Sequence, residues 1–236
     1  MTKPPVTKIL IANRGVIACR IISTAQNMGI KTVAIASDPD KTSLHTKMAD
    51  EVVWIGGESA VESYLDIDKV LQAAKQTGSD AIHPGYGFLS ENADFAQACE
   101  KEGIVFIGPA PDVIRKMGLK DKARAIMKKA GVPIVPEVSG KDLKASAEKI
   151  GLPVLVKAAA GGGGKGMRKV ERLEELEEAI QSCMREAESA FGNDSVFIEK
   201  YLETARHVEV QIFGDSHGNV VHLFERDCSL QRRHQK

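Results

Sequence analysis

The chain has 236 residues, of which 43% are hydrophobic and 27% charged, so it can bury the core of one or two globular domains. Lysine plus arginine and aspartate plus glutamate both number 32, so no overall basic field favours nucleic acid or an anionic membrane as a partner. The four cysteines are far apart and form no Cys-x-x-Cys pair, which argues against a zinc site and against a disulfide framework. Because the net charge is zero, any anion that binds must be bound by local groups.

The cellular compartment is inferred from the cysteines and from the start of the chain. Residues 1–8 are too short to form a signal or transit peptide before the first apolar run, and no apolar run approaches about 18 residues. We expect the cytoplasm, or the mitochondrial matrix if a presequence is missing.

Short β-branched runs alternate with helical patterns over about residues 6–110. The runs at 8–12, 31–36, 80–83 and 104–107 predict strands, and the segments 14–28, 66–76 and 92–101 predict helices. Several of these helices are followed by glycine, as is typical of helix C-termini. The alternation predicts an α/β fold with a parallel, doubly wound sheet. Because Asn13-Arg14-Gly15 follows the first strand where a dinucleotide fingerprint would need Gly-x-Gly-x-x-Gly, nothing indicates NAD.

A second module begins near the prolines of 131–136, after two predicted helices at 111–117 and 121–130. Its predicted order is a strand at 153–156, a glycine-rich segment, a strand at 167–170, an amphipathic helix and a strand at 195–199.

The last predicted element is an antiparallel hairpin, with strands at 207–213 and 220–225. His207, Glu209 and Gln211 share one polar face of the first of these strands. A lone hairpin is only marginally stable, so we expect the chain to be part of a longer protein.

The glycine-rich segment is the strongest chemical signal. Gly161 to Gly164 expose backbone N–H groups between Lys157 and Lys165, an arrangement that suits the covering of phosphates. It is not a P-loop, because Ala159 stands at the first glycine position and Gly166 stands where Ser or Thr is needed. The alternative is a mobile surface linker.

Six segments, taken in order, resemble consecutive signatures of biotin carboxylase, a member of the ATP-grasp superfamily. They are residues 11–15, 82–92, 127–133, 157–167, 206–209 and 225–236. The resemblance implies a Rossmann-like N-terminal domain at 1–112, a helical linker at 113–131, an ATP-grasp lid subdomain at 132–203 and the start of a truncated central ATP-grasp subdomain at 204–236. Val16 departs from the family, which usually has glutamate there, and this casts doubt on subunit contacts more than on chemistry.

The same resemblance implies an ATP-dependent ligase that activates bicarbonate as carboxyphosphate and transfers CO2 to N1 of biotin. Most of the implied site residues bind ATP. They are Lys120, Lys157, Gly162, Gly163, Gly164, Gly166, Met167, Glu199, Lys200, Leu202, His207, Gln231 and His234. His234 and Lys236 match the phosphate and bicarbonate end of the site and are the catalytic candidates. The loop His83–Gly87, with Glu91, is implied to face the carboxylation centre, although a tight turn that only packing demands remains the alternative.

The implied cofactors are ATP and Mg²⁺ or Mn²⁺, with biotin as the carried substrate. The metal-binding glutamates of the family lie downstream of Lys236, so we expect no metal ligand within the chain and no carboxylase activity from these 236 residues alone. The implied partners are a biotin carboxyl carrier, a carboxyltransferase, bicarbonate and a second copy in the full-length dimer. Two alternatives stay open: another ATP-grasp ligase such as a carbamoyl-phosphate synthetase, or a non-catalytic binding module.

Overall fold

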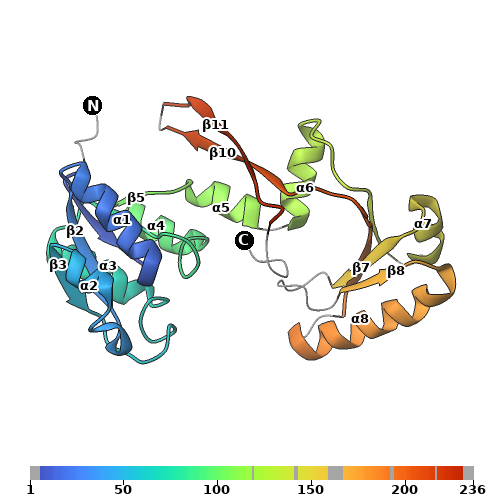
Figure 1. Cartoon of the computed structure of the whole chain (residues 1–236), viewed down its shortest axis with the longest axis horizontal. Coiled ribbons are helices and arrows are strands. Elements are labelled where there is room, and N and C mark those ends of the chain that lie inside the picture. Colours follow the sequence, from blue (N-terminus) through green and yellow to red (C-terminus); the bar gives the residue numbers. More distant parts are fainter. Residues whose placement is uncertain are drawn as a thin grey trace. The chain divides into compact units, whose positions relative to one another are not determined.

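Residues 6–118, 120–140, 143–158, 167–191, 194–215 and 217–230 are described by the computed structural model. They belong to two units, Met1–Ile126 and Met127–Lys236, which are coloured from blue to green and from green to red in Figure 1.

Strands and helices alternate through the first unit. In chain order they are β1 (Lys8–Ile11), α1 (Gly15–Asn27), β2 (Lys31–Ala36), α2 (Leu44–Met48), β3 (Glu51–Trp54), α3 (Ile67–Thr77), β4 (Ala81–His83), α4 (Ala93–Lys101), β5 (Val105–Phe106), α5 (Pro111–Gly118) and α6 (Lys120–Lys129), which crosses the unit boundary. The strands form one sheet in the order β3-β2-β1-β4-β5, and all neighbours are parallel.

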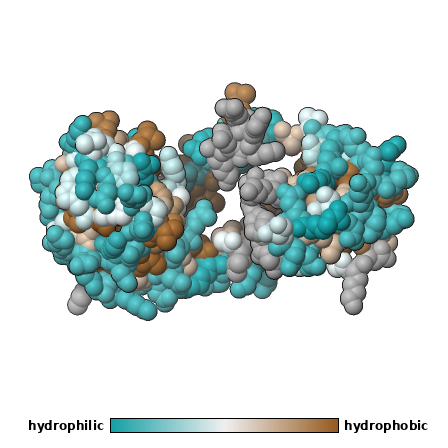
Figure 2. Space-filling view, turned by 90° about the horizontal axis from the view of Figure 1, so that it is seen from below, coloured by the Kyte–Doolittle hydropathy of each residue, from teal (hydrophilic) through white to brown (hydrophobic). Residues whose placement is uncertain are grey.

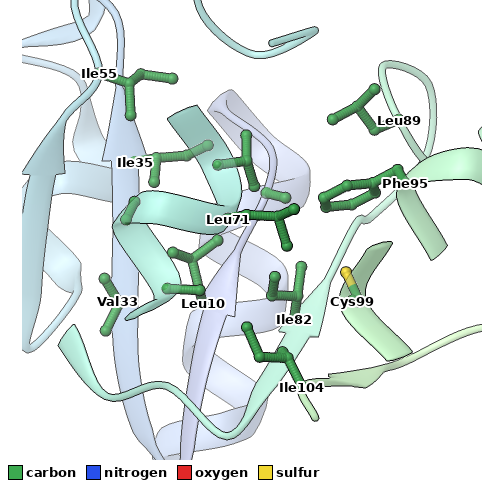
Figure 3. Close-up of a cluster of buried hydrophobic side chains, with 14 of the residues drawn as sticks. Leu10, Val33, Ile35, Ile55, Leu71, Ile82, Leu89, Phe95, Cys99 and Ile104 are labelled. Atoms are coloured by element: carbon green, nitrogen blue, oxygen red, sulfur yellow. The ribbon is translucent and has the colours of Figure 1, made fainter. Parts of the chain in front are cut away.

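Helices pack on both faces of this sheet. Ile9 and Ile11 of β1 belong to the same core cluster as Ala18 and Ile22 of α1. On the opposite face, Leu10 of β1 lies in the cluster formed with α3 and α4 (Figure 3). Burial on both faces explains the continuous apolar runs, and the predicted doubly wound α/β fold is confirmed.

The turns between the elements use the predicted residues. Gly29, Gly78 and Gly103, which follow predicted helices, have φ angles of 74°, 64° and 70°, a left-handed conformation that favours glycine. The Asp66 side chain caps α3 by accepting a hydrogen bond of 3.0 Å from the Lys69 N–H.

A buried histidine makes the stability of the first unit pH-dependent. His45 is fully buried, and its Nε2 lies 3.2 Å from the carbonyl oxygen of Ile35. Its Nδ1 has no hydrogen-bond partner within the described ranges. Burial therefore lowers the pKa of His45 below its ordinary value of 6.5, and the folded state favours the neutral ring.

We predict that the free energy of unfolding falls as the pH drops through 6.5 toward the lower folded pKa, because the unfolded chain then binds a proton that the folded chain refuses. Urea unfolding measured between about pH 8 and about pH 5 gives this slope. His45→Gln, which cannot titrate, is expected to reduce the dependence of the unfolding free energy on pH. An equal dependence in the variant would mean that other groups cause it.

The second unit is built on an antiparallel sheet. Its elements are β6 (Glu137–Ser139), α7 (Leu143–Ile150), β7 (Val154–Ala158), β8 (Met167–Val170), α8 (Leu176–Phe191), β9 (Val196–Lys200), β10 (Val208–Gly214) and β11 (Val220–Asp227). Four strands pair in the order β6-β9-β7-β8. Helices α7 and α8 pack on one face of this sheet, where Val154, Val156 and Ile198 are fully buried.

The remaining strands, β10 and β11, form the predicted antiparallel hairpin. The pairing register shifts between Val210 and Ile212, and Phe224 of β11 has a φ angle of 62° at this bulge. Apolar side chains of both strands are exposed, among them Ile212 and Phe224.

The elements that the sequence did not predict are short. They are α2, β3 and β6, together with α7, whose apolar residues Leu143, Ala147 and Ile150 have helical spacing. No helix in the described part of the chain is long and apolar enough to cross a membrane, and hydrophilic residues cover most of the face drawn in Figure 2.

Candidate functional site

The face of the β6-β9-β7-β8 sheet opposite the helices carries polar groups. Strand residues alternate between the two faces, so Lys157 of β7 points away from the buried Val154 and Val156. The register places Met167 of β8 directly opposite Lys157, and Glu199 of β9 opposite Leu155 on the same face. Lys157, Met167 and Glu199 are all partly exposed. The structure therefore brings together three of the residues predicted to bind ATP.

An ion pair joins two of these residues. The Lys157 ammonium donates a hydrogen bond to Oε2 of Glu199 on the neighbouring strand. The two side chains are 26% and 15% exposed, so each charge is largely removed from water and a partner is needed. A lysine fixed in this way can present a positioned cation to an anion, and Glu199 is its counter-ion in this structure.

The glycine-rich segment connects two paired strands. Strand β7 ends at Ala158 and β8 begins at Met167, with Lys157 and Met167 as a cross-strand pair. The predicted positions Gly162, Gly163, Gly164 and Gly166 lie outside the described residues. The strand–segment–strand arrangement around them is as predicted from the sequence.

At the end of β9 and just beyond it lie Lys200 and Leu202, two more of the residues implied to bind ATP. The N–H groups of Lys200 and Tyr201 donate to the carbonyls of Pro136 and Pro153 at 2.9 and 3.0 Å. The Lys200 ammonium donates to the carbonyls of Gly151 and Leu152, so its side chain has a structural role. Leu202 is 52% exposed.

His207 lies at the start of the hairpin. Its N–H donates to Oγ of Ser229 at 2.9 Å, and its carbonyl accepts from the N–H of Cys228 at 2.7 Å. Hydrogen bonds from Ser229 and Arg206 lower the pKa of the neighbouring Asp227 to about 2. Glu209, on the polar face predicted for this strand, pairs with Arg226. The backbone of His207 is thus held by the two residues that follow β11.

The other candidates lie at the limits of the described part. Lys120 begins α6, but its side chain is not among those described. Gln231, His234 and Lys236 fall outside the described residues. Within the described ranges, no three His, Cys, Asp or Glu side chains are grouped as metal ligands.

In the first unit, polar residues gather where the parallel strands end. The His83 Nδ1 accepts a hydrogen bond from the Gly85 N–H at 3.0 Å, and burial lowers the pKa of this histidine. The Asn13 amide bonds to the same loop, and Asp40, which follows β2, is buried. Sequence reasoning singled out the His83–Gly87 loop but missed Asn13 and Asp40, although polar residues directly after parallel strands were a usable signal.

Two family models match the chain. "Biotin carboxylase, N-terminal domain" matches residues 5–114, and "Carbamoyl-phosphate synthase L chain, ATP binding domain" matches residues 120–236. Together they cover nearly all of both units.

Curated relatives match from end to end of this chain but are longer. The mitochondrial methylcrotonoyl-CoA carboxylase subunit alpha of Dictyostelium discoideum is 60% identical over 98% of this chain and 34% of its own length. Biotin carboxylase 2 of Bacillus subtilis is 55% identical over 98% of this chain and 53% of its own length. The chain thus spans about a third to a half of these relatives.

A solved structure agrees with both the sequence and the fold. The biotin carboxylase domain dimer of Hydrogenobacter thermophilus 2-oxoglutarate carboxylase, in complex with MgADP, ADP and bicarbonate, superposes with a TM-score of 0.85 at 48% identity. The match covers 98% of this chain and 52% of that one.

Proposed function

The chain belongs to the biotin carboxylase family, and we propose on this premise that it binds ATP and serves the ATP-dependent carboxylation of biotin with bicarbonate. The observation that carries the proposal is the pairing of Lys157 with Glu199 on the face of the β6-β9-β7-β8 sheet opposite α7 and α8, which we call the open face. A cation fixed at the end of a strand, directly before a glycine-rich segment, suits a triphosphate.

Each predicted site residue is assigned to one part of the nucleotide or to bicarbonate. Lys157 and Lys120 hold the phosphates, and Met167 follows the covering glycines Gly162, Gly163, Gly164 and Gly166. Glu199, Lys200 and Leu202 bind the adenine end, and His207 and Gln231 lie near the ribose and phosphates. His234 and Lys236 act at the phosphate and bicarbonate end.

The chemistry requires that bicarbonate attack the γ-phosphorus of ATP, which gives carboxyphosphate and ADP. Decarboxylation of carboxyphosphate releases CO2 and phosphate, and N1 of biotin traps the CO2 as its proton passes to the released phosphate. The protein must hold the anionic groups in place and keep water from the short-lived anhydride. Mg²⁺, when bound, neutralises charge on the phosphates, and the described residues form no cluster of ligands for it.

The proposed setting is an acyl-CoA carboxylase. The Dictyostelium relative is a methylcrotonoyl-CoA carboxylase subunit, which favours a biotin carrier and a carboxyltransferase as partners. The Hydrogenobacter domain is a dimer, which favours a dimer here as well. The proposed compartment is the cytoplasm, with the mitochondrial matrix as the alternative because that relative is named as mitochondrial.

A second function, that of a carbamoyl-phosphate synthetase, rests only on the match of residues 120–236 to the ATP-binding domain of carbamoyl-phosphate synthase. It is not favoured, because the relatives matched over 98% of this chain are a biotin carboxylase and a carboxylase subunit. The two functions differ in the acceptor of the activated carboxyl group, which is a ureido nitrogen in one and ammonia in the other.

The test uses a hybrid in which this chain replaces the matching part of Bacillus subtilis biotin carboxylase 2. We expect phosphate release from ATP to require bicarbonate and to be stimulated by biotin, with ammonia having no effect. Stimulation by ammonia and not by biotin would favour the second function. The unaltered Bacillus enzyme is the positive control, and this chain alone, which we expect to be inactive, is the negative one.

A further inference from the structure

The strand order of the first unit marks one position as its ligand crevice. In the order β3-β2-β1-β4-β5, the chain runs outward from β1 to β3 and then crosses to β4 on the other side of β1. Open α/β sheets bind ligands outside the carboxyl ends of the strands at this switch point. Here Asn13 follows β1, and Pro84, Gly85, Tyr86, Gly87 and Phe88, which we call the 84–88 loop, follow β4.

Asn13 fixes the 84–88 loop from the β1 side. Its side-chain Nδ2 donates to the carbonyls of Pro84 at 2.7 Å and Tyr86 at 2.8 Å, so both amide protons are used. The residue is 3% exposed. Gly85 has a φ angle of 65°, and a Cβ added there would lie 2.7 Å from Asn13 Nδ2. The close approach of loop and amide thus requires glycine at this position.

A second attachment starts from the buried carboxylate of Asp40. The Arg14 guanidinium, adjacent to Asn13, donates to both oxygens of Asp40 at 2.5 and 2.6 Å. The Tyr64 hydroxyl donates to Oδ2 at 2.7 Å, and the Ser37 and Ser43 hydroxyls donate at 3.1 and 2.9 Å. Asp40 therefore joins the segments that follow β1 and β2 to Tyr64.

Tyr64 contacts the 84–88 loop through its ring. Its ring stacks on that of Phe88 with centroids 5.0 Å apart and planes inclined by 16°. Phe88 has a φ angle of 42°, which is rare for a residue with a side chain and persists only where the surroundings hold it. The contacts form a closed circuit. Asn13 bonds to the 84–88 loop, Phe88 of that loop stacks on Tyr64, Tyr64 bonds to Asp40, and Asp40 bonds to Arg14, which is next to Asn13 in the chain.

We propose that Asn13, Asp40 and Tyr64 are positioning residues, which hold the 84–88 loop in one conformation and so present Tyr86 to the crevice. Tyr86 is 63% exposed although its own carbonyl accepts a hydrogen bond from Asn13 and Phe88, two residues later, stacks on Tyr64. A side chain offered to solvent from a loop fixed at two points suits ligand contact, because little conformational entropy is then lost on binding. That the ligand is the biotin end of the reaction rests on the proposed function; that the circuit fixes the loop does not.

The first test is hydrogen exchange in the chain itself. The reporters are the amides of Gly85, bonded to His83, and Ser90, bonded to the carbonyl of Gly87. We expect Asn13→Ala to raise their exchange rates about tenfold, and Tyr64→Phe, which keeps the ring, about fivefold. The control is Thr32→Val, which removes a buried hydroxyl bonded to Asp50 near the amino end of β2. Unchanged exchange rates of the two reporter amides in both variants, or an equal rise of these rates in the control, would overturn the proposal.

The second test separates positioning from a general structural effect. In the hybrid with the Bacillus enzyme, Tyr64→Phe and Asn13→Asp are expected to raise the KM for biotin about fivefold and leave the KM for ATP within about twofold. Faster exchange with an unchanged KM for biotin would contradict the positioning role. If the unsubstituted hybrid shows no biotin-dependent activity, the proposed function fails, and exchange alone decides whether the circuit holds the loop.

Discussion

In the hybrid, Lys157→Ala is expected to raise the KM for ATP by about thirtyfold, because a charge-assisted hydrogen bond to phosphate contributes about 1.5–3 kcal/mol. Lys157→Arg, which keeps the charge but alters its geometry, is expected to raise the KM for ATP about fivefold. Lys157 is suited to this role by its place on the open face, where Glu199 holds it. Steady-state kinetics with ATP varied at saturating bicarbonate and biotin gives the numbers.

The matched control for this prediction is Lys149→Ala, which removes an exposed lysine of α7 in the same unit. Its KM for ATP is expected to stay within about twofold of the unsubstituted hybrid. If Lys157→Ala behaves like this control, Lys157 is a structural partner of Glu199 and the phosphate role is wrong.

Asp40→Ala is expected to lower the free energy of unfolding of the first unit by about 3 kcal/mol, because it leaves a paired guanidinium and a buried tyrosine hydroxyl without their acceptor. The carboxylate is 4% exposed and accepts from four side chains. The single tryptophan, Trp54, lies on β3 and provides a fluorescence signal specific to this unit in urea titrations.

The control comes from two residues earlier in the chain. Asp38 forms a surface pair with Lys41 at 2.8 Å and is 47% exposed, so Asp38→Ala is expected to leave the free energy of unfolding nearly unchanged. A similar loss in both variants would mean that the Asp40 network contributes no more than a surface ion pair.

The same carboxylate gives a second pH window. The Arg14 guanidinium holds the pKa of Asp40 well below its ordinary value of 3.8. Its contribution to stability is therefore present above about pH 4 and is lost as the pH falls toward the folded pKa. This window opens below about pH 4, whereas the one expected from His45 opens at the ordinary histidine pKa of 6.5.

The sequence predicted those parts of the fold that depend on local patterns. The apolar run at 31–36 and the glycine at 78 determine a strand and a helix end without help from distant residues. It missed α2, whose five residues make little more than one helical turn, so that no helical period can be read. It also missed β3, although Val52-Val53-Trp54 is a β-branched, apolar run like those of the predicted strands. Such segments are stabilised by the sheet and helices around them.

Of the candidate site, the sequence predicted individual residues but not their relations. Lys157 was evident from its place between an apolar strand and the glycines. Its pairing with Glu199 depends on the register between β7 and β9, strands separated by about 40 residues, which no local pattern specifies. The Asn13–Asp40–Tyr64 network likewise joins residues that become neighbours only when the parallel sheet has formed.

The most direct test of the central claim, that separate segments of the second unit form one nucleotide site, is a hydrogen-exchange footprint of the hybrid with and without saturating MgATP. We predict that ATP slows exchange at both Met167–Val170 and Glu199–Leu202, and that Lys157→Ala removes both effects together. Protection confined to the Bacillus-derived part, with these segments unchanged, would contradict the claim.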